Sequence, residues 1–60
     1  MKKGDKVIVT NPSNDDYGRT GTIYEIKEEV FWLEMHGKNG EHTGYGAGFD
    51  EYEIKLIEGQ

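Results

Sequence analysis

The chain has 60 residues, no cysteine, and a net charge of −5 that results from twelve acids and seven bases. This length allows one domain, near the lower limit at which packing alone holds a fold, and the absence of cysteine excludes disulfides and thiolate metal sites. Strong non-specific binding to nucleic acid needs clustered bases, so the charge argues against a general nucleic-acid binder.

The N-terminus has the basic start of a signal peptide without the apolar segment that would follow it. Lys2 and Lys3 lead into Gly4, Asp5 and Lys6, which are not apolar. The longest unbroken apolar run, Val30–Leu33, is far shorter than the roughly 20 residues that span a membrane. We therefore expect a complete, cytoplasmic protein with no membrane partner.

The first half of the chain predicts two strands separated by a loop. In residues 5–10, Val7 and Val9 share one face of a β-branched segment. Residues 11–16 all favour turns, through the fixed φ of proline and the side-chain hydrogen bonds of asparagine and aspartate. A second strand is expected over 22–27, followed by a tight connection at 28–29.

The clearest predicted strand covers residues 30–36. Phe31, Leu33 and Met35 alternate with a second set that includes Trp32 and Glu34. Since that second set also contains His36, it is expected to form the outer face. A hairpin turn with an Asn-Gly pair should follow at 37–40.

The second half predicts a short strand over 41–45 and a closing strand over 54–57. Residues 44–48 read Gly-Tyr-Gly-Ala-Gly, which we expect to be too rich in glycine for a regular strand and to bulge. Asp50 and Glu53 have the spacing of a capping box, which indicates one short helical turn.

Together these elements predict a single all-β domain over residues 1–60. It should have about five short strands and one short helical turn before the last strand. The expected core consists of Val7, Val9, Ile23, Phe31, Leu33, Met35 and Leu56.

Two stretches resemble known families. Residues 4–9 followed by Gly18-Arg19-Thr20-Gly21-Thr22-Ile23 resemble the KOW motif of ribosomal proteins and transcription elongation factors. Residues 49–57 are similar to the closing turn and strand of small bacterial and phage SH3-like proteins. A fainter similarity, through a proline-containing loop, an aromatic residue and Gly-Thr, is to the SH3-like accessory subunit of photosystem I.

The resemblance implies an SH3-like barrel, and its KOW part implies contact with RNA or with a transcription or translation complex. KOW loops carry basic residues near the glycines, whereas Arg19 here follows Asp15 and Asp16. SH3-like barrels serve many unrelated binding functions, so the fold alone does not choose among them.

Aromatic residues supply the candidate binding site. Trp32 and Tyr24 are expected on adjacent strands, Tyr17 and Tyr45 are expected in flanking loops, and Arg19 is a further candidate. Such side chains form peptide-binding or base-stacking platforms. The alternative is structural, because a core this small can use Trp32 to cover one open end of the barrel.

Catalytic, metal and cofactor sites are not expected. His36 and His42 flank the hairpin turn with Glu34 and Glu41 nearby, but a zinc site needs three or four ligands in fixed geometry. Ser13 has no neighbouring histidine, and the glycines at 44, 46 and 48 do not open a helix as a phosphate loop does. We expect a non-enzyme.

Three functions remain open. The first is a protein-interaction module, monomeric or weakly self-associating, anchored by Trp32 and the loop aromatics. The second is a KOW-type module that touches nucleic acid weakly through Arg19 and the N-terminal lysines. The third is an acidic inhibitor that occupies a basic site on a nucleic-acid-binding protein. Such an inhibitor could be encoded by a phage. It ranks last because the acids are dispersed along the sequence.

Overall fold

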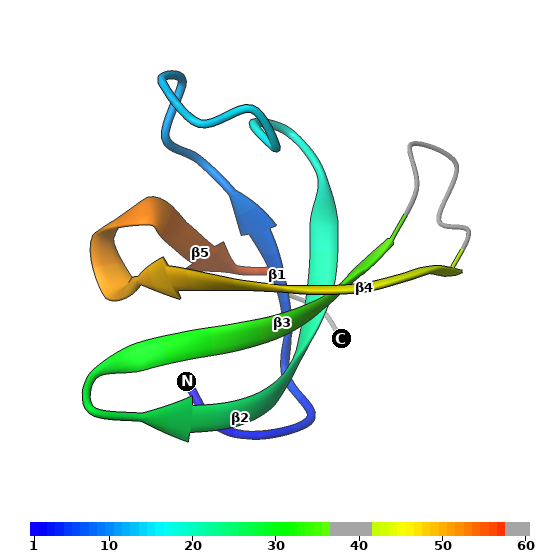
Figure 1. Cartoon of the computed structure of the whole chain (residues 1–60). Coiled ribbons are helices and arrows are strands. Elements are labelled where there is room, and N and C mark those ends of the chain that lie inside the picture. The colour runs from blue at the N-terminus through cyan, green and yellow to red at the C-terminus, as the bar shows by residue number, and fades with distance from the viewer. Residues whose placement is uncertain (37–41, 58–60) are drawn as a thin grey trace.

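The fold is all-β, with five strands and one turn of 3-10 helix. A computed structural model describes residues 1–36 and 42–57, so the predicted turn at 37–40 and the tail at 58–60 lie outside the described residues. The elements, shown in Figure 1, are β1 (Lys6–Val9), β2 (Thr20–Lys27), β3 (Val30–His36), β4 (His42–Asp50), η1 (Glu51–Glu53) and β5 (Ile54–Leu56). The predicted class, strand number and helical turn are confirmed.

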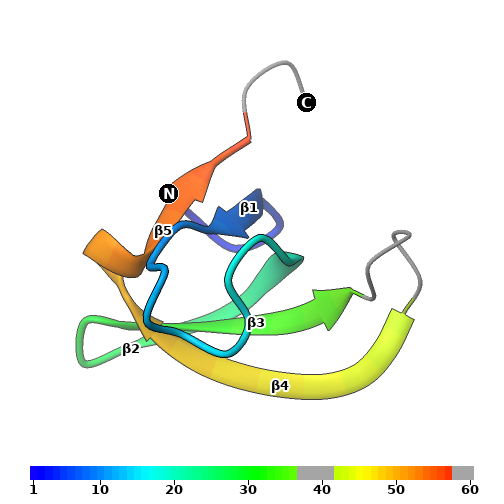
Figure 2. The same cartoon turned by 90° about the horizontal axis from the view of Figure 1, so that it is seen from above.

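The strands form one antiparallel sheet in the order β4-β3-β2-β1-β5. The chain passes from β4 at one end of this order to β5 at the other through η1. Figure 2 shows β4 curving along the molecule toward η1, with β1 and β5 side by side beyond it. The short connection through η1 thus brings the two ends of the sheet toward each other.

The core lies on the inner face of this curved sheet. Every other residue of β1 and β3 is buried there, as the alternation predicted, and β2 contributes Ile23. The buried side chains are those of Val7, Val9, Ile23, Phe31, Leu33, Met35, Phe49 and Ile54. All residues of the predicted core are therefore confirmed except Leu56.

Leu56 was predicted to be buried, but it is 43% exposed. The buried residue of β5 is Ile54 instead. The register pairs Ile54 with Val9 and Leu56 with Val7, so both side chains belong to the inner face of the sheet. Leu56, however, is the last residue of an edge strand three residues long. Alternation predicted its face correctly but could not indicate that the strand ends there.

The glycine-rich segment was predicted to be too irregular for a strand, and this is wrong. The whole segment belongs to β4, a strand of nine residues. The predicted bulge does occur, as a shift in the β3–β4 register between Glu34 and His36. Beyond it, Ala47 and Phe49 alternate with Gly46 and Gly48, so the side chains pack inward while the outer face of β4 is bare backbone at the two glycines.

The β2–β3 connection is the predicted two-residue turn. Glu28 and Glu29 both have positive φ, 52° and 66°. Positive φ at both central residues is the signature of a type I′ turn, which asparagine and glycine adopt readily. In this region a residue with a Cβ has a conformational free energy about 1 kcal/mol less favourable than in the right-handed region. The two glutamates therefore strain the turn.

The helical turn is capped as the sequence predicted. Asp50 and Glu53 form a capping box, and the Asp50 N–H donates a hydrogen bond to Glu53 Oε1 at 3.1 Å. The same Glu53 carboxylate accepts a hydrogen bond from Asn11 Nδ2 at 3.1 Å, which joins η1 to the β1–β2 loop. No helix in residues 1–36 or 42–57 has the length and apolarity needed to cross a membrane.

Candidate functional site

The outer face of β2, β3 and β4 carries two exposed aromatic rings, which lie against glycines of β4. We call the surface formed by Tyr24, Trp32, Glu34, Gly46 and Gly48 the sheet face. Trp32 pairs with Gly48, and a Cβ placed on Gly48 would lie 3.0 and 3.1 Å from two atoms of the indole ring. A Cβ on Gly46 would lie 2.8 Å from the hydroxyl oxygen of Tyr24. Both rings therefore occupy space that a Cβ on β4 would enter.

A β-bulge positions Tyr24 for this contact. The β2–β3 register shifts between Ile23 and Glu25, which leaves Tyr24 without a partner on β3. Such a bulge re-aims the side chain that it carries, and here the phenol reaches across β3 to Gly46. Tyr24 is 51% exposed and Trp32 is 38% exposed, so Trp32 lies on the outer face as predicted.

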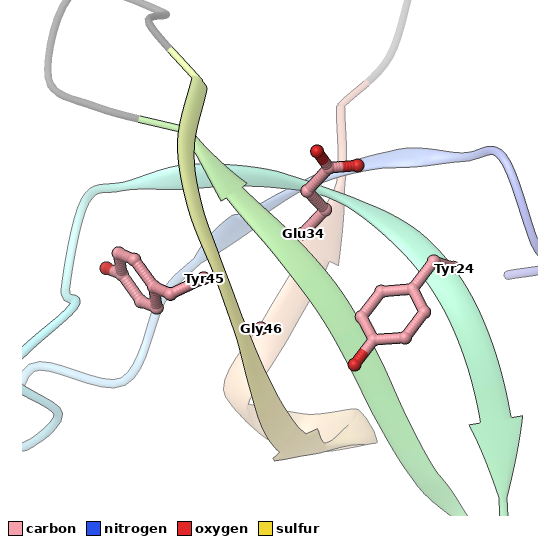
Figure 3. A pocket seen from close by; sticks show the side chains of 4 residues that line it. All are labelled: Tyr24, Glu34, Tyr45 and Gly46. Atoms are coloured by element: carbon pink, nitrogen blue, oxygen red, sulfur yellow. The ribbon is translucent and has the colours of Figure 1, made fainter.

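A shallow depression of about 350 Å³ begins on the sheet face and crosses β4. It is lined by Tyr24, Glu34, Tyr45 and Gly46. Figure 3 shows Tyr24 and Tyr45 on either side of the β4 ribbon, with Glu34 beside the strand. Because Gly46 has no side chain, the hollow continues from one tyrosine to the other over the backbone.

Tyr45 and Arg19, two of the predicted site residues, are joined by hydrogen bonds. The Tyr45 hydroxyl donates to Asp16 Oδ1 at 3.0 Å and accepts from Arg19 Nη1 at 3.0 Å. Arg19 Nε also lies 3.9 Å from Asp16 Oδ1. The guanidinium is thus partly neutralised by a carboxylate, which lowers its attraction for a phosphate.

Tyr17 lies apart from the sheet face, in the β1–β2 loop. Its N–H donates to the Asn14 carbonyl at 3.0 Å, and its side chain is exposed. The loop has the predicted asparagine turns, since Asn11 Oδ1 accepts from the Ser13 N–H and Asn14 Oδ1 accepts from the Asp16 N–H. Tyr17 is therefore held on a structured loop, beside Asp16 in sequence.

His36 lies on the outer face, with each ring nitrogen near a threonine of β2. Nδ1 is 3.4 Å from Thr20 Oγ1, and Nε2 is 3.3 Å from Thr22 Oγ1. His36 and His42 are register partners on β3 and β4. Among the described residues, no three histidine, aspartate or glutamate side chains come together as metal ligands.

A second hollow, which the sequence did not indicate, lies where the β2–β3 hairpin faces η1. We call it the end groove. Its volume is about 490 Å³, and it is lined by Ile26, Glu29, Phe31, Asp50, Glu51 and Tyr52. Ile26 pairs with Phe31 across the hairpin, and the predicted strand over 22–27 already contained it. The approach of η1 to the hairpin is a tertiary feature that no local pattern shows.

The chain was compared with models of known protein families, with curated proteins and with solved structures, and none of them matches it.

Proposed function

We propose that the protein is a small, non-catalytic, cytoplasmic binding module that recognises a protein partner through the sheet face. The observation that carries this proposal is that Trp32 and Tyr24 are both exposed and lie against two neighbouring glycines of β4, Gly48 and Gly46. Tryptophan and tyrosine contribute most strongly to binding energy at protein interfaces, because they bury a large area and keep a polar group.

Three further features support this use of the sheet face. Trp32 sits in the middle of a seven-residue strand paired on both sides, so its position is fixed before binding. The depression beside Tyr24 offers a place for a partner's side chain. The strand order and the turn before β5 also support the proposed SH3-like barrel, a fold whose members often bind proteins or nucleic acids.

The KOW-type function ranks second. Its best candidate for contact with nucleic acid is Arg19, whose guanidinium is held by Asp16 and Tyr45. A net charge of −5 also opposes the approach of phosphates. We expect any affinity for RNA or duplex DNA to be weak and strongly dependent on salt.

The experiment uses Trp32→Ala, with Tyr17→Ala as the matched control. Tyr17 is an exposed aromatic residue of the β1–β2 loop and belongs neither to the sheet face nor to the end groove. Each variant, purified and checked for folding, would be used to capture partners from the native cells. We expect Trp32→Ala to fold and to lose about 2 kcal/mol or more of binding energy, while the control binds as the wild type.

Two results would contradict the proposal. If Trp32→Ala unfolds, the indole is a structural cover for the β4 backbone. If it folds and binds every partner normally, the working surface lies elsewhere. Sedimentation of the wild type and of Trp32→Ala at rising concentration would show whether the chain self-associates and whether this association needs Trp32.

A further inference from the structure

The end groove combines an open apolar floor with an exposed aromatic ring. Phe31 and Ile26 face inward from the end of the hairpin, and Ile26 remains 37% exposed. Tyr52, on η1, is 79% exposed. Exposed apolar groups that line a hollow with a polar rim are typical of interaction sites.

Carboxylates form the rim of this groove. Glu29 comes from the hairpin turn, and Asp50 and Glu51 come from the junction of β4 with η1. None of the three forms an ion pair with another residue of the described part of the chain. The pKa of Tyr52 is raised, first by its hydrogen bond to the Asp50 carboxylate and then by the charges of Asp50 and Glu53. The groove therefore has a negative potential that favours a cation.

The hairpin turn beside the groove is strained. Glu28 and Glu29 occupy the two positive-φ positions where asparagine and glycine are preferred. The same chain has an Asn-Gly pair at residues 39–40. Glu29 lines the groove, so one substitution of the turn changes both the backbone strain and the charge of the rim.

We propose that the end groove binds a basic segment of a partner protein. An arginine or lysine of that segment places its aliphatic stem on Ile26 and Phe31, and its charged group meets the carboxylates of the rim. Long basic side chains commonly bury their stems in this way while the charge stays at the surface. The site shares no residue with the sheet face and does not depend on its function.

The binding test is a titration followed by the amide NMR signals of the whole chain. The probes are a peptide of alternating arginine and alanine and a peptide of the same length with glutamate in place of arginine. We expect only the basic peptide to shift signals, at Glu29, Glu51 and Tyr52, and we expect added salt to weaken it. Shifts confined to Tyr24 and Trp32, or equal shifts with both peptides, would overturn the proposal.

The decisive variant is Glu28→Asn with Glu29→Gly. It should raise the melting temperature by about 5 °C, because it relieves the strained turn. It should also weaken the basic peptide about fivefold, which corresponds to the loss of one exposed ion pair. A gain of stability with a loss of binding is the pattern of a strained functional site.

The control for charge is Asp15→Asn with Glu25→Gln. Each double variant removes two acids, so the net charge changes from −5 to −5 + 2 = −3 in both. We expect the control to bind the basic peptide nearly as the wild type does. If both variants weaken it equally, the attraction is that of net charge alone and the groove is not the site. Glu51→Gln tests the rim without changing the turn, and unchanged affinity in it and in the turn variant would also overturn the proposal.

Discussion

The two faces of β4 are built in opposite ways. On the inner face, Ala47 and Phe49 supply their own side chains to the core. On the outer face, Gly46 and Gly48 supply no side chain, and the covering rings come from Tyr24 on β2 and Trp32 on β3. The inner face of β4 is thus covered by side chains of β4 itself, whereas its outer face is covered by side chains of two other strands.

This difference separates stability from recognition. Side chains on the inner face are buried, so their loss leaves a cavity. The rings on the outer face are half exposed, so they can contact a partner while they shield the β4 backbone. Substitutions on the inner face should therefore change mainly folding, and substitutions on the outer face should change the tryptophan environment as well.

The largest expected effect is on the inner face. Leu33 is fully buried in the centre of the core, and Leu33→Ala should reduce the free energy of unfolding by about 2–5 kcal/mol. A domain of 60 residues has little more stability than this to lose. Thermal unfolding followed by circular dichroism measures the loss, and a variant that melts near the wild type would show that the inner face is not the core.

The second prediction concerns the cover of the outer face. A Cβ at Gly48 would meet Val30 Cγ1 at 2.9 Å as well as the indole, so Gly48→Ala must displace short or rigid groups. We expect a loss of about 1–3 kcal/mol, typical of overpacking, and a red shift of the fluorescence of Trp32, the only tryptophan.

Gly46→Ala is the matched control for this prediction. Its new methyl group would meet the phenol end of Tyr24, which is the far end of a side chain that is half exposed and can swing away. It should cost little and leave the tryptophan emission unchanged. Equal stability of the two variants would mean that Trp32 is not fixed against β4.

The sequence predicted the inner face much better than the outer face. Alternation in β1 and β3 correctly identified the buried valines and Phe31, Leu33 and Met35, because period two determines which face a side chain lies on. It also placed Trp32 outward. The glycine-rich strand was misread because glycine lowers strand propensity, and propensity cannot show that rings from two other strands replace the missing side chains.

The candidate sites depended still more on tertiary structure. Tyr24, Trp32 and Tyr45 were named from their residue type and expected strands, but the contact of Tyr24 with Gly46 requires a bulge that no local pattern indicates. The pairing of Tyr45 with Asp16 joins residues 29 positions apart. The end groove exists only because η1 faces the β2–β3 hairpin.

A third, smaller effect is expected where β4 meets the β1–β2 loop. Tyr45→Phe removes the hydroxyl that joins β4 to Asp16 and Arg19, and should cost about 1 kcal/mol, the net value of a hydrogen bond. Tyr17→Phe makes the same chemical change on an exposed ring of the β1–β2 loop, to which Asp16 and Arg19 also belong, and should leave the stability unchanged. Urea unfolding compares the two, and equal midpoints would contradict the pairing.

The smallest expected effect is a pH dependence of stability that arises from Glu53, the residue of η1 that is hydrogen-bonded to the β1–β2 loop. Hydrogen bonds lower its pKa below the usual 4.5, first from the Asp50 N–H and then from the Asn11 amide. A carboxylate with a lowered pKa in the folded state stabilises the fold above its unfolded pKa, and this contribution disappears as the pH falls through the folded pKa.

Glu53→Gln cannot titrate, so it should melt below the wild type at pH 7 and approach it at pH 3. Glu51→Gln, on the same turn, serves as the control for a general charge effect. If the difference in melting temperature between wild type and Glu53→Gln is the same at pH 7 and pH 3, the carboxylate does not hold the loop against η1.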